Sequence, residues 1–265
     1  MNADEAISQR FKIIVAYDGR PFSGWQSQPG GNTVQDILLG ALQSICPAIT
    51  MVQGSGRTDA GVSADGQVAH FDAPPGWRMN STEWRKALNS KLPAAIRIFD
   101  AQPVPPDFHA RFSAEAKTYR YRIYTGEVLP PLFHGLVWHD NRIHDFAALE
   151  NAARLFEGTH DFRPFSAKRN DGYDEERDTV RTIYSVDLIQ IDDHECELEF
   201  VGNGFLYKMV RVLVGSSVEV SNGKREVPEI HDRLKSGLPF LKAPFCAPSD
   251  GLRLVNVRYP DFITP

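Results

Sequence analysis

The chain has 265 residues, of which 42% are hydrophobic and 24% are charged, and this is the composition of an ordinary soluble globular protein with one large domain or two small ones. No apolar run approaches the length of a membrane span, and the polar, acidic start of the chain is neither a signal nor a transit peptide, so we expect a cytoplasmic protein without a membrane partner. The formal net charge of −5 argues against a strongly basic nucleic-acid binder, and RNA binding would require local basic patches on an acidic body.

The first hundred residues predict a strand, a helix, a strand, a helix and a strand. Alternating apolar residues predict the strands, and apolar stripes behind capping residues predict the helices. The run Pro103 to Pro106 breaks this pattern, so we place the boundary between two halves there, at 1–104 and 105–265. The expected elements are strands at 11–17, 67–71 and 96–99, a helix at 34–45 capped by Thr33, and a helix framed by Asn80 and Glu83 that ends near Ser90.

A glycine-rich loop, Gly54 to Val62, concentrates charged groups just before the second strand. Its glycines let a large ligand approach the backbone, and Arg57, Thr58 and Asp59 lie between them. A Walker phosphate loop would need a lysine, and a dinucleotide fingerprint would need a small residue where Asp59 stands. The loop therefore fits either a catalytic loop attached to a sheet or a turn in which the arginine and the aspartate form only a local ion pair.

The second half predicts strands interrupted by three helices. An irregular polar segment, 162–178, separates two of these elements and carries Lys168 and Arg169, which we expect to contact RNA. The expected strands are 117–124, 180–191, 195–201 and 252–257, and the expected helices are 146–156, 205–215 and a short one between Pro228 and Gly237.

Basic and aromatic side chains alternate along the strand 117–124. Arg120 and Arg122 lie on one face of this strand, and Tyr119 and Tyr121 lie on the other. The pattern fits a sheet that faces RNA, where aromatic rings stack on bases and arginines meet phosphates. It equally fits a solvated edge strand with tyrosines packed beneath it.

The segment 205–215 is apolar nearly all round, which predicts a buried helix. It contains Arg211, and a buried guanidinium needs an anionic partner. The pattern alone would accept any structural carboxylate as that partner.

Four motifs stand out along the chain: Gly56-Arg-Thr-Asp-Ala-Gly-Val-Ser-Ala64, an opening of Tyr17-Asp-Gly19 with Phe22-Ser-Gly-Trp-Gln26, His109-Ala-Arg-Phe-Ser113 followed by Lys117-Thr-Tyr-Arg-Tyr121, and Gly202-Asn-Gly-Phe205 followed by Met209-Val-Arg211. Together they resemble the tRNA pseudouridine synthase A family, and the resemblance spans nearly the whole chain. It implies an α+β pseudouridine synthase fold, with two similar α/β halves that share a central, mostly antiparallel sheet and have a cleft between them. It also implies a homodimer in which one tRNA touches both subunits, with modification at positions 38, 39 and 40 of the anticodon stem-loop.

The resemblance also implies roles for single residues. Asp59 corresponds to the catalytic nucleophile, and Arg57 to the residue that helps to flip the target base. Arg211 corresponds to the arginine that pairs with the catalytic aspartate, and Tyr119 to the tyrosine that contacts the substrate uridine. The segment that touches tRNA corresponds to Phe108, His109, Ala110, Arg111 and Phe112, with Arg111 foremost.

Pseudouridine formation detaches uracil from its ribose, turns it and rejoins it through carbon. The reaction is redox-neutral and needs neither nicotinamide nor flavin, and the three widely spaced cysteines offer no metal pattern, so we expect no cofactor and no metal. An aspartate is ionised at neutral pH, and its carboxylate could attack either the base or the sugar carbon. Two other functions stay open, namely RNA binding without catalysis, and a glycosidase-like hydrolysis in which Asp65 is the second carboxylate.

Overall fold

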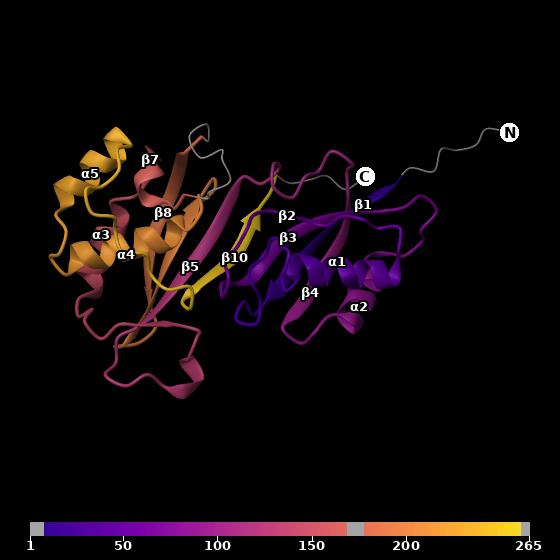
Figure 1. The fold of residues 1–265 in the computed structure, drawn as a ribbon, viewed down its shortest axis with the longest axis horizontal. Coiled ribbons are helices and arrows are strands. Elements are labelled where there is room, and N and C mark those ends of the chain that lie inside the picture. Colours follow the sequence, from indigo (N-terminus) through magenta and orange to yellow (C-terminus); the bar gives the residue numbers. More distant parts are fainter. Residues whose placement is uncertain (1–7, 169–177, 261–265) are drawn as a thin grey trace. The chain divides into compact units, whose positions relative to one another are not determined.

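The computed structural model describes residues 8–168 and 178–260 of the chain (Figure 1). These residues form two compact units: the first contains the chain up to Glu115 and again from Leu254, and the second is Ala116–Arg253. The boundary predicted at residue 104 precedes this division. The difference arises because Phe108 and Ala110 hydrogen-bond to strands of the first unit and so keep the following turn with it.

The sheet of the first unit has the strand order β4–β1–β3–β10, with β2 paired to β3. β1 is antiparallel to both β3 and β4. β4 continues past its predicted end at residue 99 and includes Pro103, which the last strand in the order tolerates because its outer side needs no N–H donor. The elements are β1 (Gln9–Tyr17), α1 (Val34–Ile45), β2 (Gln53–Gly54), β3 (Ser63–Ala73), α2 (Ser81–Lys91), β4 (Ile96–Val104) and, from Leu254 onward, β10 (Leu252–Arg258).

Both helices of the first unit begin where their capping residues predict. The Thr33 side chain accepts a hydrogen bond from the Asp36 N–H at the start of α1. Asn80 and Glu83 form a reciprocal capping box at the start of α2. Each cap satisfies N–H groups that the first helical turn leaves without partners, which is why the sequence locates these helix starts to the residue.

An aromatic cluster forms part of the core of the first unit. Alternate residues of β1 from Phe11 to Tyr17 point inward, as a half-buried strand requires. Phe11 stacks on Phe71 of β3 with their ring centroids 5.7 Å apart, and Trp84 of α2 meets Phe71 edge-on at 4.9 Å. This packing fixes β1 and β3, the two strands that support the glycine-rich loop.

The second unit has the strand order β5–β9–β8–β7, and all three of these pairings are antiparallel. The short strand β6 runs parallel to β5. The predicted hairpin of 180–191 and 195–201 is confirmed, and α3 packs against both α4 and β8 (Figure 1). The elements are β5 (Ala116–Tyr124), β6 (Trp138–His139), α3 (Phe146–Arg154), β7 (Gly158–Asp161), β8 (Val180–Gln190), β9 (Glu195–Gly202), α4 (Met209–Ser221) and α5 (Val227–Ser236), with short 3₁₀ turns at Pro131–Phe133 and Arg163–Phe165.

The helix that we predicted at 205–215 begins later and ends later than its apolar pattern indicates. Lys208 has a left-handed backbone with φ of 58°, and α4 begins only at Met209 and continues to Ser221. The apolar residues before Met209 therefore belong to a turn, and periodicity alone could not separate them from the helix. Within α4, Met209, Val210 and the residues 212–215 are buried as predicted, but Arg211 is half-buried.

The architecture is α+β with mainly antiparallel strand pairing, which confirms the predicted fold class. Across the described residues, no helix combines the length and the apolar character that a membrane crossing requires.

Candidate active site

The glycine-rich loop joins two antiparallel strands of the first unit. Gln53 and Gly54 of β2 pair with His70 and Ala69 of β3, and the Ser55 N–H continues this ladder to the Val68 carbonyl at 2.7 Å. The loop between these strands presents Arg57, Thr58 and Asp59 in turn. Arg57 is exposed, Thr58 is buried and Asp59 is half-buried, so the carboxylate is partly shielded while the guanidinium extends into solvent.

The loop packs backbone to backbone on the segment Tyr17–Gln26. The Trp25 N–H donates to the Thr58 carbonyl at 3.1 Å. Gly24 has a φ of 94°, and a Cβ there would lie 2.7 Å from that same carbonyl oxygen. A Cβ at Gly19 would lie 2.1 Å from the Val62 carbonyl oxygen. Only glycine, which has no side chain, allows this close approach. The segment Tyr17–Gln26 therefore supports the backbone of the loop that carries Asp59.

Buried polar side chains complete the support of the loop. The Tyr17 hydroxyl lies 2.8 Å from Thr58 Oγ1, and burial raises the pKa of Tyr17 to about 12, so this hydroxyl stays protonated near neutral pH. On the other side, the Ser55 hydroxyl donates to Gln67 Oε1 at 2.7 Å, and Gln67 Nε2 donates to the Gly56 carbonyl at 3.0 Å. These bonds fix the loop on both flanks of Arg57.

Arg57 itself is held loosely. Its Nε donates to Gln26 Oε1 at 3.1 Å in an exposed position. A long, exposed side chain with a neutral partner can leave it at little cost, because solvent replaces the hydrogen bond. The arrangement therefore combines a rigid backbone with a guanidinium that is able to move.

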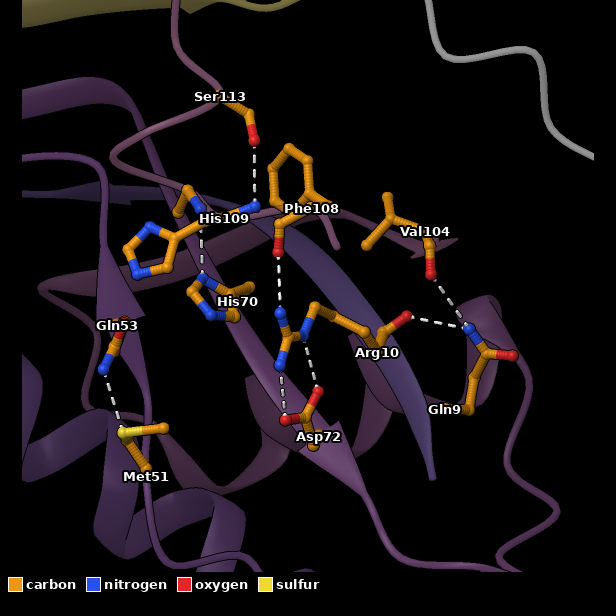
Figure 2. Close-up of polar contacts among 11 residues, drawn as sticks. Gln9, Arg10, Met51, Gln53, His70, Asp72, Val104, Phe108, His109 and Ser113 are labelled. Atoms are coloured by element: carbon orange, nitrogen blue, oxygen red, sulfur yellow. Dashed lines mark hydrogen bonds and ion pairs between the residues drawn. The ribbon is translucent and has the colours of Figure 1, made fainter. Parts of the chain in front are cut away.

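The segment predicted to touch tRNA forms a tight turn in the first unit (Figure 2). Phe108 and Ala110 are buried, and the ring of His109 folds back over the turn. Arg111 is exposed, and Phe112 is 75% exposed. Of the five predicted residues, Arg111 and Phe112 are thus the two whose side chains lie open to a partner.

β5 pairs with β9 along its whole length, and its arginines are bound to glutamates of that strand. Arg120 Nε donates to Glu199 Oε2 at 2.6 Å, and Arg122 forms an ion pair with the buried Glu195. β5 is paired on both sides, so it is not an edge strand. The ion pairs give Arg120 and Arg122 partners within the sheet, and the prediction that this strand faces RNA stays a prediction. Tyr119 is buried on the opposite face, edge-on to Phe205 at 5.1 Å.

Arg211 lies in the first turn of α4 and is oriented by a neighbouring segment. Its Nε donates to the Ala247 carbonyl at 2.7 Å, and its own carbonyl accepts from the Ala247 N–H at 3.0 Å. The Tyr121 hydroxyl holds the next carbonyl, that of Pro248, at 2.8 Å. Because Asp59 belongs to the first unit and Arg211 to the second, their predicted ion pair stays a prediction. Lys168 is exposed, and Arg169 lies outside the described residues.

Comparison with known proteins identifies the family. A model of the tRNA pseudouridine synthase family matches residues 13–113 and 152–260. The chain is 47% identical to tRNA pseudouridine synthase A of Akkermansia muciniphila, over 95% of this chain and 96% of that protein. It is 42% identical to the protein of the same name from Geobacillus kaustophilus, over 96% of each. The chain therefore belongs to the tRNA pseudouridine synthase family, which confirms the resemblance drawn from the motifs.

The chain is also similar to a solved structure. It matches a chain in a crystal structure of a Cbf5–Nop10–Gar1 complex with a TM-score of 0.37 and 12% identity. The match covers 92% of this chain and 48% of that one.

Sequence reasoning missed the residues that hold the site in shape. Tyr17, Gly19 and Gly24 support the loop of Asp59, although the composition of their motif suggests only packing of Phe22 and Trp25. The available signal was two glycines near these aromatic residues, Gly19 before Phe22 and Gly24 between Phe22 and Trp25, since glycine in a turn next to a core segment often permits a close backbone approach.

Proposed function

We propose that this chain isomerises uridine to pseudouridine in tRNA, at positions 38, 39 and 40 of the anticodon stem-loop. The observation that carries the proposal is the position of Asp59, which is half-buried on a loop clamped by backbone contacts in a chain of this family. A nucleophile must be held in one place relative to its target, because small displacements of reacting groups reduce the rate strongly.

The reaction breaks the bond between N1 of uracil and C1′ of the ribose and forms a bond from C5 of the same base to C1′. The proton on C5 is lost and N1 gains one, so no electrons are exchanged with another molecule. The Asp59 carboxylate begins the reaction by attacking the flipped-out uridine, either at the sugar carbon or at the base. Both routes need an ionised carboxylate in the loop and access to an extruded nucleotide.

The other predicted residues take complementary roles. The exposed Arg57 is suited to enter the helical stack when the target base leaves it, because its hydrogen bond to the neutral Gln26 side chain is easily replaced by solvent. Tyr119 and Arg211 bind the substrate uridine, and Arg211 pairs with Asp59. Lys168 and Arg169, together with Arg111 and Phe112, contact the RNA backbone and bases. We further propose a homodimer that acts in the cytoplasm and needs neither metal nor cofactor.

An Asp59→Asn variant tests the assignment most directly, since it removes the charge and keeps the shape. Pseudouridine in an unmodified tRNA transcript is mapped before and after treatment with pure protein, and binding of the same transcript is measured in parallel. We expect no pseudouridine above background while tRNA binding persists. Retained turnover would refute the role of Asp59.

Asp65 provides the matched control, because it is an exposed carboxylate on β3 only six positions further along the chain. Asp65→Asn should leave both turnover and binding unchanged. Release of free uracil that depends on Asp65 would instead indicate the glycosidase-like hydrolase. Wild-type protein that binds tRNA and never modifies it would indicate a binding protein.

A further inference from the structure

The turn Phe108–Phe112 is held by side chains from three distant strands or segments. Arg10 of β1, itself paired with Asp72 at 2.7 Å, donates to the Phe108 carbonyl at 2.8 Å (Figure 2). The Ala110 N–H donates to Nδ1 of the buried His70 at 3.2 Å, and the Ala110 carbonyl accepts from the Tyr259 hydroxyl at 2.6 Å. The backbone of the turn is thus tied to the sheet beneath it at closely spaced positions.

His109 closes the turn from within. Its Nδ1 accepts hydrogen bonds from the N–H groups of Arg111, at 3.1 Å, and Phe112, at 3.3 Å. Its own N–H donates to the Ser113 hydroxyl at 3.0 Å (Figure 2). The His109 ring lies 4.8 Å from that of His70 and 4.4 Å from that of Phe112, measured between centroids. The position of the Phe112 ring therefore depends on a series of ring contacts, edge-on between His70 and His109 and tilted between His109 and Phe112, that begins in the core.

This rigid turn exposes an aromatic ring with a cation beside it. Phe112 is 75% exposed, and the Arg111 guanidinium carbon lies 5.4 Å from the centre of its ring. A fixed ring loses little conformational entropy when a ligand covers it, so a planar apolar partner gains most of the burial free energy. Unpaired bases are such partners, since every base offers a planar face and carries a phosphate within reach of an adjacent cation.

The contact of Phe112 and Arg111 with RNA is part of the proposed function. We propose in addition that these two side chains form a pre-organised platform on which one unpaired base stacks, and that His70 is the positioning residue that keeps this platform in shape. The proposal rests on the proposed function, which makes RNA the ligand. His70 touches no RNA in this scheme and acts only through the turn. Burial lowers the pKa of His70 to about 4, so near neutral pH its ring is uncharged and Nδ1 remains the acceptor that the Ala110 N–H needs.

A Phe112→Leu variant tests the platform, because it keeps an apolar side chain and removes the planar face. We expect tRNA binding to weaken by about 5- to 150-fold, the range found for the loss of one stacked base. KM should rise by a similar factor while kcat stays near the wild-type value, and Phe112→Tyr should behave as wild type. Phe99→Leu is the control, since Phe99 is 60% exposed on β4 of the same unit and is assigned no ligand.

The role of His70 is tested by non-additivity. His70→Ala should raise KM in the wild-type background and add little in the Phe112→Leu background, because both changes remove the same interaction. A purely structural role would give the same loss in both backgrounds. If His70→Ala fails to fold, Tyr259→Phe removes another bond of the turn without leaving a cavity, and the same pattern is expected.

The outcomes separate this proposal from the one on which it rests. Wild-type protein that neither binds nor modifies tRNA would end the proposed function and this inference together. Wild-type protein that makes pseudouridine, with Phe112→Leu matching Phe99→Leu in KM, would leave the function intact and refute the platform alone.

Discussion

Two segments of the first unit carry proposed functional residues and are held in different ways. The loop around Asp59 is fixed by close backbone contacts that glycines permit, at Gly19 and Gly24. The turn Phe108–Phe112 is fixed by side-chain hydrogen bonds from His70, Arg10 and Tyr259. The difference indicates which substitutions should disrupt each segment. An added side chain should disrupt the loop, and the loss of a single hydrogen-bond donor or acceptor should disrupt the turn.

The largest effect is expected at Gly19. In the Gly19→Ala variant the new Cβ would lie 2.1 Å from the Val62 carbonyl oxygen, and backbone cannot move away as a flexible side chain can. We expect a loss of about 1–3 kcal/mol or more in the free energy of unfolding. We also expect kcat for pseudouridine formation to fall while tRNA binding is retained. Urea titration and single-turnover assays on the same preparation measure both.

Gly40→Ala is the matched control for this prediction. Gly40 lies in α1, and among the described residues no atom beyond its own helix turn would come within 4 Å of a Cβ there. The substitution should stabilise the protein by about 1 kcal/mol, the difference in helix propensity between the two residues, and leave kcat unchanged. Equal behaviour of the two variants would show that the close approach at Gly19 does not shape the loop.

Acid should destabilise the turn. Burial is the main cause of the lowered pKa of both His70 and His109; the charge of Arg10 lowers both further, and the charge of Asp72 raises that of His70. Between about pH 6.5 and pH 4 the unfolded chain would bind protons that the folded turn excludes, so the free energy of unfolding falls as the pH falls. One such group contributes at most about 1.4 kcal/mol per pH unit.

The measurement is a series of urea titrations through this window for wild type and His70→Asn, whose amide does not titrate. The variant should show a shallower dependence of stability on pH than wild type. Parallel curves would mean that His70 does not exclude a proton from the folded turn.

This contrast also explains what could be predicted from the sequence. The loop is encoded in one contiguous string, Gly56 to Ala64, so both its place and its charged residues follow from neighbouring residues alone. The anchors of the turn lie 98, 40 and 149 residues away along the chain, at Arg10, His70 and Tyr259. No local pattern connects such positions, because only the pairing of the strands brings them together.

The arginines of β5 illustrate the same limit. Their alternation with tyrosines fitted an RNA-facing sheet and a solvated edge equally well, and it did not indicate the glutamates that bind Arg120 and Arg122, which lie 79 and 73 residues further along the chain. The longer strands and the caps of α1 and α2 follow from local rules and were predicted, although β3 and β4 extend beyond their predicted bounds. The short strands β2, β6 and β7 were not predicted. The partner of a charged side chain depends on the order of the strands in the sheet, so it could not be predicted from the sequence.

Two tyrosine hydroxyls allow a smaller and more specific comparison. Tyr17 holds Thr58 in the loop, and Tyr259 holds the Ala110 carbonyl in the turn, while burial raises the pKa of both phenols so that each stays protonated. Replacing either by phenylalanine should cost about 1–2 kcal/mol, since a buried partner loses its hydrogen bond. Tyr17→Phe should lower kcat, and Tyr259→Phe should raise KM. Steady-state kinetics on both variants measure these two parameters. If kcat and KM changed in the same way in both variants, the separate roles of loop and turn would be contradicted.

The smallest effect concerns which arginines meet phosphate. Arg111 is exposed on the turn, whereas Arg120 is bound to Glu199 at 2.6 Å and lies near Glu197 at 3.6 Å. If Arg111 contacts one phosphate, Arg111→Ala should reduce the slope of log affinity against log salt concentration by about 0.7–0.9, because one fewer counterion is released. Arg120→Ala should leave this slope unchanged, since glutamates already neutralise its charge. Binding of one tRNA transcript across a salt series gives both slopes, and a reduced slope for Arg120→Ala alone would mean that β5 meets RNA after all, with its glutamates displaced.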